Sequence, residues 1–320
     1  MLFMTIEGNE CAPAKVRVKP MKMLERLAGY WLIKLVIGIL RILPHRAMES
    51  VGAGLGLFFQ RISKRSRRDV KTNFDVIYPA MPQSERDALE RRVFINFGKT
   101  AAEFLCIPRM TPQAIADCSV LEGIEHLDTA LAKGKGVLLI SAHFGNWELL
   151  AAKLIALGYP IDAIARDPEL PATADLLREI RKSTVQRSYP RNSILPAVRG
   201  LKQNRVLAIL PDQHDCDGLL VNFMGHPAMA APGPAAIAWL TGAAVVPVFS
   251  YRQPDDSFMV KFSPEVILEK SADKDYSIHH WTQQIMDVIS EKISATPDQW
   301  LWLHNRWRPT TGAKRLEEYR

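Results

Sequence analysis

The sequence predicts an α/β fold in which a mixed sheet is flanked by helices, preceded by an N-terminal membrane-associated helix. Two observations carry this prediction. From about residue 121, short apolar runs alternate with segments of helical periodicity, a pattern typical of parallel or mixed sheets covered by helices. Before residue 63, the chain instead contains longer apolar stretches that single cations interrupt.

The composition is that of an ordinary globular protein. The chain has 320 residues, of which 48% are hydrophobic and 23% charged, so it can bury a core and is not a disordered chain. Its formal net charge of +7 fits an anionic partner, such as acidic lipid, an acidic carrier protein or nucleic acid. The four cysteines are scattered and include no C-x-x-C pair, which argues against a zinc ribbon.

Four segments divide the chain. Residues 1–22 lack an apolar core and read as a polar leader, which we expect to be disordered or to precede the natural start. We expect membrane-associated helices over residues 23–62, an α/β domain over residues 63–310 and a polar tail over residues 311–320.

The segment Leu27–Leu43 is the most apolar part of the chain. It covers about 17 residues, the lower limit for a helix that crosses a bilayer. Lys34 and Arg41 interrupt it on one helical stripe, so the helix either spans the membrane with its cations reaching the surface or lies in the interface. An ordinary core helix is the alternative.

A second apolar segment, Val51–Ile62, leads into a basic run at residues 61–71. A basic cluster beside a membrane helix attracts anionic lipid. Nucleic acid is not an expected partner, because no aromatic residues interleave the charges. A solvated helix face is the alternative for such a run.

The later part of the chain reads as strands separated by helices. Helical periodicity runs from about Pro82 to Leu105, and again from Trp147 to a glycine cap at Gly158. The predicted strands are residues 136–142, 161–166, 205–211, 243–251 and 258–262.

His143 ends the apolar run "GVLLISA", and Glu148 follows five residues later. In one continuous helix these residues would lie about 140° apart, so His143 is expected in a turn and Glu148 in the first helical turn. Gly145 gives the turn its freedom and Asn146 is the expected N-cap. A carboxylate beside an imidazole makes it a better general base, so the pair predicts acid–base chemistry. A structural histidine is the alternative.

The stretch "AHFGNWELLA" resembles the H-x-x-x-x-(D/E) motif of bacterial lipid A late acyltransferases. Further similarities to that family occur in "RRDVKTNFDVIYP", "LPDQHD", "FMGHPAMAAPGPAAIAWLTGAAVVPVF" and "PDQWLWLHNRWRP". The chain departs from the family pattern at Asn305, where an arginine is usual, and in "FMG" in place of "FFG".

The resemblance implies a glycerolipid acyltransferase-like fold and a defined reaction. A fatty acyl chain would pass from an acyl carrier protein thioester to a hydroxyl of a Kdo-bearing lipid A precursor, at the cytoplasmic face of the inner membrane. His143 would be the general base and Glu148 would orient its ring. The thioester is already activated, so we expect neither a metal nor a cofactor, and no G-x-S-x-G elbow is present.

Five further residues are assigned to substrate binding on this resemblance. Arg181 and Asp212 match family positions, and an arginine there would bind a phosphate or the developing oxyanion. Arg166 is a weaker candidate, and Gly233 and Thr241 lie in an apolar region that would accept an acyl chain. Ion pairs that support the fold, and core packing, are the alternatives.

The C-terminal stretch from Trp300 to Trp307 combines tryptophan, histidine and arginine, which suits a lipid headgroup interface or a structural role.

Three other functions stay open. The chain would act on another glycolipid or a lysophospholipid, with acyl-CoA as a possible donor, or it would be a non-catalytic scaffold. A metallohydrolase is the third, because "DQHDCDG" gathers acidic residues, His and Cys, although no paired metal-ligand spacing accompanies them.

Overall fold

The computed structural model describes residues 35–40, 42–165, 180, 182, 184–190 and 194–308. The predicted leader at 1–22 and tail at 311–320 therefore lie outside the described residues, as does most of the apolar segment Leu27–Leu43.

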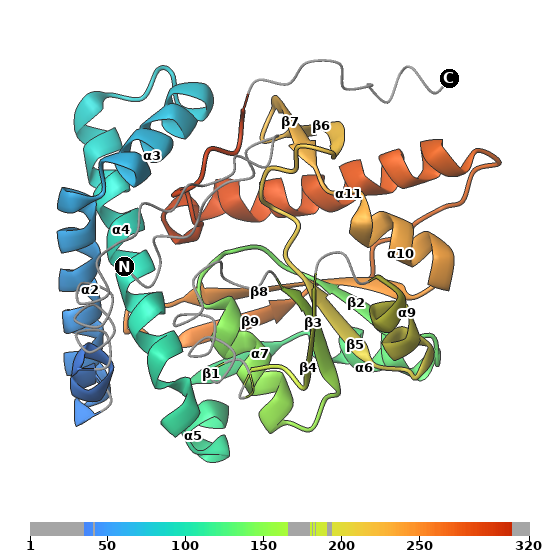
Figure 1. Ribbon diagram of the computed structural model, residues 1–320, viewed down its shortest axis with the longest axis horizontal. Coiled ribbons are helices and arrows are strands. Elements are labelled where there is room, and N and C mark those ends of the chain that lie inside the picture. Colours follow the sequence, from blue (N-terminus) through green and yellow to red (C-terminus); the bar gives the residue numbers. More distant parts are fainter. Residues whose placement is uncertain are drawn as a thin grey trace, which may run out of the picture.

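A seven-stranded mixed sheet forms the centre of the molecule, with the strand order β1-β9-β8-β2-β5-β3-β4 (Figure 1). Neighbouring strands are parallel except for β8 and β9, which form an antiparallel pair. The strands of this sheet are β1 (Ser119–Glu122), β2 (Val137–Ile140), β3 (Ile161–Ala165), β4 (Arg187–Pro190), β5 (Val206–Ile209), β8 (Ala244–Arg252) and β9 (Phe258–Phe262).

A two-stranded antiparallel hairpin stands outside the main sheet and consists of β6 (Leu219–Phe223) and β7 (His226–Ala230). The α-helices are α2 (His45–Ile62), α3 (Lys64–Ile77), α4 (Gln83–Cys106), α5 (Pro112–Asp117), α6 (Glu125–Ala132), α7 (Trp147–Ala156), α9 (Ile194–Lys202), α10 (Gly233–Thr241) and α11 (Lys274–Ala295). Two short 3-10 helices are η1 (Ile107–Arg109) and η2 (Pro297–Gln299). Residues 35–40, the described part of the apolar segment Leu27–Leu43 nearest its centre, are also helical.

Helices cover both faces of the sheet, with α10 and α11 on one side and α6 and α7 on the other (Figure 1). Side chains of β2 alternate between the two layers because successive residues of a strand point to opposite faces. Leu138 and Ile140 join the core beneath α9, α10 and α11, whereas Val137 and Leu139 join the core beneath α6 and α7. β2 is buried on both faces, which explains its unbroken apolar sequence.

All five predicted strands are present, and the predicted helices at 82–105 and 147–158 correspond to α4 and α7. The sequence missed β1 and β4, which are four residues long and partly exposed, so they carry no apolar run. It also missed the β6–β7 hairpin, whose turn around Gly225 needs a positive φ of 84°.

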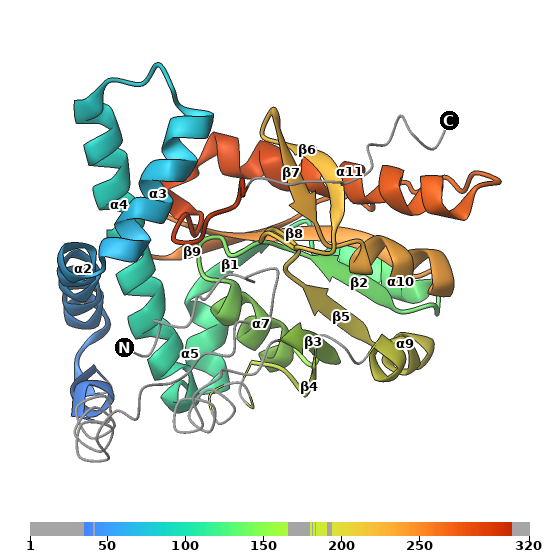
Figure 2. The same ribbon diagram turned by 45° about the horizontal axis from the view of Figure 1, so that its top comes forward.

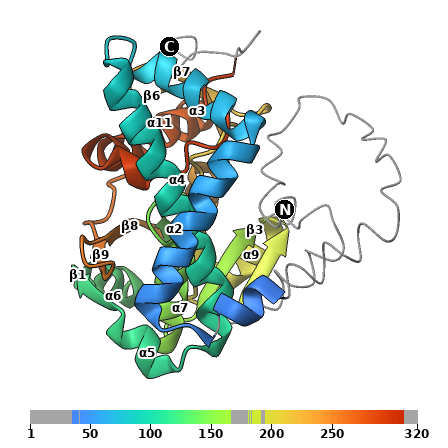
Figure 3. The ribbon, with the colours of Figure 1, turned by 90° about the vertical axis from the view of Figure 1, so that its left-hand side faces the viewer.

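The helices α2 and α4 pack at very short range (Figure 3). Their contact is made by glycines: a Cβ on Gly56 would lie 2.0 Å from the carbonyl oxygen of Phe94, and one on Gly98 would lie 2.2 Å from that of Gly52. No side chain fits between the two backbones, so this interface depends on residue size rather than on backbone flexibility.

The outer face of α2 is apolar. Val51, Leu55, Phe58 and Ile62 are 38%, 40%, 60% and 59% exposed, and their spacing places them on one stripe of the helix. Within the described part of the chain, no helix combines the length and the apolar character that crossing a membrane requires.

Replacing Gly56 by alanine is expected to lower the free energy of unfolding by about 1–3 kcal/mol, because the new methyl group forces the helices apart. Gly54→Ala is the matched control in the same helix, since a Cβ there meets nothing within 4 Å. The control should be neutral or stabilising by up to about 1 kcal/mol. Urea unfolding of both variants measures the difference, and equal effects would contradict the tight packing.

Candidate active site

His143 and Asp212 lie at the same edge of the sheet. Ile140 of β2 pairs with Ile209 of β5, and the two polar residues each follow three positions later. The carboxyl ends of adjacent parallel strands meet at one edge, where ligands of open α/β sheets bind. Figure 2 shows β2 and β5 side by side in the sheet.

The two residues are in direct contact. Nδ1 of His143 lies 2.9 Å from Oδ1 of Asp212, and the backbone N–H of His143 donates to Oδ2 at 3.1 Å. An ionised carboxylate only accepts hydrogen bonds, so Nδ1 is the donor in this contact, which does not involve Nε2. The His143 side chain is 22% exposed while that of Asp212 is fully buried, so the imidazole is the part of the pair that a substrate can reach.

Asp212 is held in its charged form. Burial alone would raise its pKa, but attraction to His143, the hydrogen bond from that ring, and the hydrogen bond from the Trp300 indole lower the pKa well below its usual range. Trp300 Nε1 donates to Oδ2 of Asp212 at 2.8 Å. A buried carboxylate fixed by several donors can stabilise an imidazolium, which is the state that a histidine base reaches when it accepts a proton.

The turn between β2 and α7 has the predicted form. Gly145 has a φ of 56°, and a Cβ there would lie 1.6 Å from the carbonyl oxygen of Ser250, so only glycine fits. Asn146 is the N-cap of α7, as predicted, and its side chain accepts the Leu149 N–H at 2.9 Å. Glu148 occupies the first turn of α7 and is half-buried.

The contact at Nδ1 brings an acid other than Glu148 to the ring. The sequence assigned ring orientation to Glu148 and substrate binding to Asp212, whereas the structure places the Asp212 carboxylate on the ring nitrogen. A role for Glu148 stays a prediction, and its position near the N-terminus of α7 favours its charged form.

The other predicted binding residues lie in different places. Thr241 ends α10: its hydroxyl donates to the Ile237 carbonyl at 2.7 Å and accepts the Ala243 N–H at 3.2 Å. It precedes β8, which is parallel to β2, so it lies at the opposite end of the strands from His143. Gly233 begins α10, and the space around its Cα is open. Arg166 and Arg181 lie outside the described residues.

The C-terminal aromatic and basic residues are buried, so they do not form a lipid headgroup interface. Trp300, Trp302 and Arg306 are at most 1% exposed, and His304 and Trp307 are 4% and 8% exposed. Burial lowers the pKa of His304 to about 3 and that of Arg306 to about 10, so at neutral pH the former is uncharged and the latter charged.

Sequence reasoning missed the residue that holds this segment in place. Asn73 of α3 is fully buried and donates to the carbonyls of Trp302 and His304 at 2.9 and 2.7 Å. Its side-chain oxygen accepts the Arg306 N–H at 3.1 Å. The only signal was its place in "RRDVKTNF", because its partners are more than two hundred residues away in the chain.

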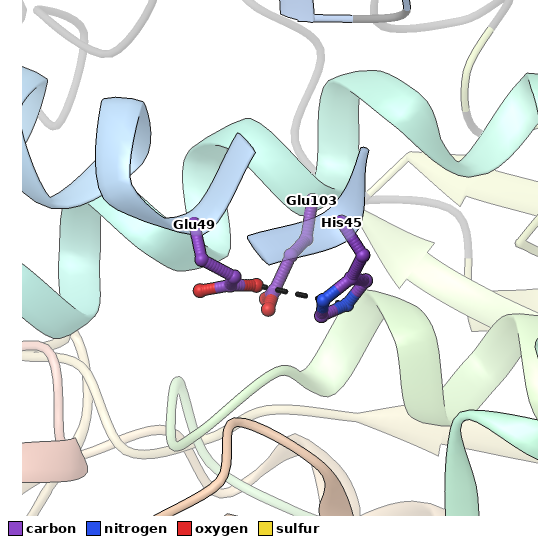
Figure 4. Close-up of side chains that lie close together, drawn as sticks. All are labelled: His45, Glu49 and Glu103. Carbon is purple, nitrogen blue, oxygen red and sulfur yellow. Dashed lines mark ion pairs between the residues drawn. The ribbon is translucent and has the colours of Figure 1, made fainter. Parts of the chain in front are cut away.

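A second polar cluster is formed by His45 and Glu49 of α2 and Glu103 of α4 (Figure 4). Candidate ligand atoms of these three residues lie within 4.8 Å of one another. Arg252 already engages Glu103 at 2.6 and 2.8 Å, and it contacts Glu49 at 3.2 Å. Because a buried guanidinium supplies the positive charge here, we assign the cluster to an ion-pair network and not to a metal site.

This network supports the turn between β2 and α7, which holds His143. Glu103 accepts a hydrogen bond from the Asn146 side chain at 2.6 Å, and Thr100 donates to the carbonyl of Gly145 at 3.0 Å. Burial, followed by the hydrogen bond and the charge of Glu103, raises the pKa of Glu49 from 4.5 to about 9. Glu49 therefore stays protonated at neutral pH beside the Glu103 carboxylate.

The raised pKa of Glu49 makes stability depend on pH. The Glu49 carboxyl loses its proton near pH 4.5 in the unfolded chain and near pH 9 in the folded chain. The free energy of unfolding is therefore highest below pH 4.5 and falls as the pH rises from 4.5 to about 9. Glu49→Gln keeps the shape of the protonated acid. It is expected to flatten this decline and to stabilise the protein at pH 8 by about 1–3 kcal/mol.

Urea unfolding at pH 5, 7 and 9 measures this effect. Glu85→Gln, at an exposed glutamate in the first turn of α4, is the control and should follow the parent protein. Parallel pH dependence in the parent and Glu49→Gln would show that Glu49 is not protonated in the fold.

Comparison with known proteins gives a consistent result. The family model described as bacterial lipid A biosynthesis acyltransferase matches residues 18–309. A lipid A biosynthesis lauroyltransferase of Escherichia coli (strain K12) is 26% identical over 288 residues, covering 87% of this chain and 92% of the relative. A phosphatidylinositol mannoside acyltransferase of Mycobacterium tuberculosis (strain CDC 1551 / Oshkosh) is 23% identical over 314 residues, covering 96% and 97%.

Among solved structures, the chain is similar to the 1-acyl-sn-glycerophosphate (LPA) acyltransferase PlsC from Thermotoga maritima. The TM-score is 0.37 and the sequence identity is 14%, with 80% of this chain and 99% of that chain covered.

Proposed function

Because the chain belongs to the bacterial lipid A biosynthesis acyltransferase family, and is therefore an acyltransferase, we propose that it acylates a Kdo-bearing lipid A precursor in lipopolysaccharide synthesis. The donor is an acyl carrier protein thioester. The observation that carries the proposal is the contact between His143 Nδ1 and the buried Asp212 carboxylate at 2.9 Å. It leaves a partly exposed imidazole at the carboxyl edge of the sheet.

The reaction follows from this geometry. Nε2 of His143 takes the proton of the acceptor hydroxyl as its oxygen attacks the thioester carbonyl carbon. The tetrahedral intermediate then collapses, the carbon–sulfur bond breaks, and the carrier thiolate receives the proton from the imidazolium. Asp212 stabilises the imidazolium between the two steps. Because a thioester is already activated, the sequence of steps requires neither a metal nor a covalent enzyme intermediate.

The remaining predicted residues keep proposed roles in substrate binding. Arg181, and more weakly Arg166, would bind phosphate groups of the acceptor, since guanidinium groups recognise phosphate through paired hydrogen bonds. Glu148 would supply a second acidic group near the imidazole, and Gly233 and Thr241 would contact the acyl chain.

A second acceptor is supported by one finding. The phosphatidylinositol mannoside acyltransferase relative matches 96% of this chain, so a mannosylated inositol lipid belongs in any substrate screen.

His143→Ala is expected to reduce acyl transfer at least about a hundredfold, because general base catalysis contributes 10²–10⁴-fold. Purified protein in detergent or vesicles is given acyl carrier protein that bears a labelled acyl group, and transfer of the label to the acceptor is measured. One reaction contains a tetra-acylated Kdo-lipid acceptor, and a parallel reaction contains a phosphatidylinositol mannoside. His280→Ala on α11 is the control and should retain activity. Activity of the parent on neither acceptor would contradict the proposed substrates, and equal activity of His143→Ala would remove His143 as the base.

The stripe on α2 supports a proposed location at the cytoplasmic face of the inner membrane. Leu55 and Phe58 are exposed apolar side chains in its middle, and exposed basic residues of α3, including Lys64 and Arg67, follow it directly. An apolar face bordered by cations suits an anionic lipid surface.

The double variant Leu55→Glu/Phe58→Glu is expected to weaken binding to vesicles of phosphatidylglycerol and phosphatidylethanolamine about tenfold or more, because it removes two exposed apolar side chains that would insert into the lipid and adds negative charge. Vesicle sedimentation measures the partitioning. Val120→Glu replaces another exposed apolar residue, on β1, and should bind like the parent. Unchanged binding of the double variant would exclude α2 as the contact face.

A further inference from the structure

We propose that Trp300 is a positioning residue that fixes the Asp212 carboxylate and thereby sets the basicity of His143. This inference rests on the proposed function, in which His143 is the base. Trp300 is 1% exposed and donates its indole N–H to Oδ2 of Asp212 at 2.8 Å. Both partners of this hydrogen bond are buried, so water does not replace the indole as the donor to Asp212.

Three donors fix the plane of the Asp212 carboxylate. Oδ1 faces Nδ1 of His143 at 2.9 Å, while Oδ2 accepts both the Trp300 indole N–H and the backbone N–H of His143. Rotation of the carboxylate would break all three hydrogen bonds together. The indole thus holds Oδ2, while Oδ1 contacts the imidazole. By fixing the plane of the carboxylate, the indole also fixes the orientation of the imidazole.

The segment Gln299–Leu301, here called the brace, is joined by backbone hydrogen bonds to the turn between β2 and α7, which holds His143. Gly145 N–H donates to the Gln299 carbonyl, and Leu301 N–H donates to the His143 carbonyl, each at 2.9 Å. The Gln299 side chain is in turn bonded to the backbone N–H and carbonyl of Arg252, at 2.8 and 2.9 Å. Trp300 and His143 are therefore held as one unit, with the brace tied to β8 behind it.

Aromatic packing prevents the indole from leaving this position. The Trp300 ring lies 4.7 Å from Trp302, 5.9 Å from Phe223 and 6.2 Å from Trp307, measured between centroids. Asn73 holds the chain that follows the brace through its bonds to the carbonyls of Trp302 and His304. Such a donor is oriented before substrate binds and requires no rearrangement during the reaction.

The indole also moderates the charge of the acid. It donates a hydrogen bond without adding charge, so it disperses the negative charge of Asp212 in a buried site. Without this donor, the carboxylate would hold the protonated imidazole more tightly. His143 would then keep its proton to higher pH, and a smaller fraction of the enzyme would carry the neutral base.

Trp300→Phe and Trp302→Phe form a matched pair of variants. Both residues are buried in the same aromatic cluster, but the Trp302 indole donates to the Pro297 carbonyl at 2.7 Å and not to Asp212. Trp300→Phe is expected to lower kcat about tenfold or more, as for loss of a hydrogen bond to a charged group, and to move the acid limb of the pH–rate profile upward. Trp302→Phe should leave the acid limb in place, whatever it does to thermal stability.

A spectroscopic measurement covers the case in which Trp300→Phe does not fold. In protein labelled with ¹⁵N-tryptophan, one of seven indole N–H signals should move upfield when Asp212 is replaced by asparagine, because its acceptor loses its charge. Identical pH profiles of the two tryptophan variants, or indole signals that do not respond to Asp212→Asn, would overturn the inference. An inactive parent protein would instead refute the proposed function and leave the spectroscopic result standing.

Discussion

The contact between the His143 imidazole and the buried Asp212 carboxylate is the interaction around which the site is organised. Burying a carboxylate is unfavourable unless it is paired and hydrogen-bonded, and Asp212 is fully buried. The fold meets this requirement with two donors from His143 and one from Trp300. The His143 side chain itself stays partly exposed at the edge of the sheet.

The rest of the structure holds this contact in place from two directions. On one side, the Gln299–Leu301 brace is hydrogen-bonded to the turn between β2 and α7, and Asn73 of α3 holds the chain that follows. On the other side, Glu103 of α4 joins the N-cap Asn146 to Arg252 of β8. The helices α3 and α4, which precede the first strand of the sheet, thus help to hold the candidate site in place.

Much of the fold could be predicted from the sequence because its signals are local. Buried strands such as β2 and β5 are continuous apolar runs, and Asn146 precedes α7 with the side chain that an N-cap requires. The position of His143 at a strand end also follows from local pattern, and so does the identity of the turn glycine, Gly145.

The pairing of the site residues could not be predicted, because it depends on strand order. Asp212 reaches His143 only since β5 lies beside β2, although β3 and β4 intervene in the sequence. The sequence alone therefore points to the nearer acid, Glu148, and gives no sign that Asp212 contacts the ring. Burial of Trp300 likewise depends on packing against Phe223 of the β6–β7 hairpin and against Trp302 and Trp307, and no local pattern distinguishes a buried tryptophan from an interfacial one.

The most direct test of this account compares Asp212→Asn with Glu148→Gln in the acyl-transfer assay, with kcat measured across pH for both. Each change removes one charge and keeps the shape of the side chain. The account predicts the larger loss of kcat, together with a shift of the acid limb, for Asp212→Asn. A large loss for Glu148→Gln beside near-parent activity of Asp212→Asn would contradict the central role of the His143–Asp212 contact.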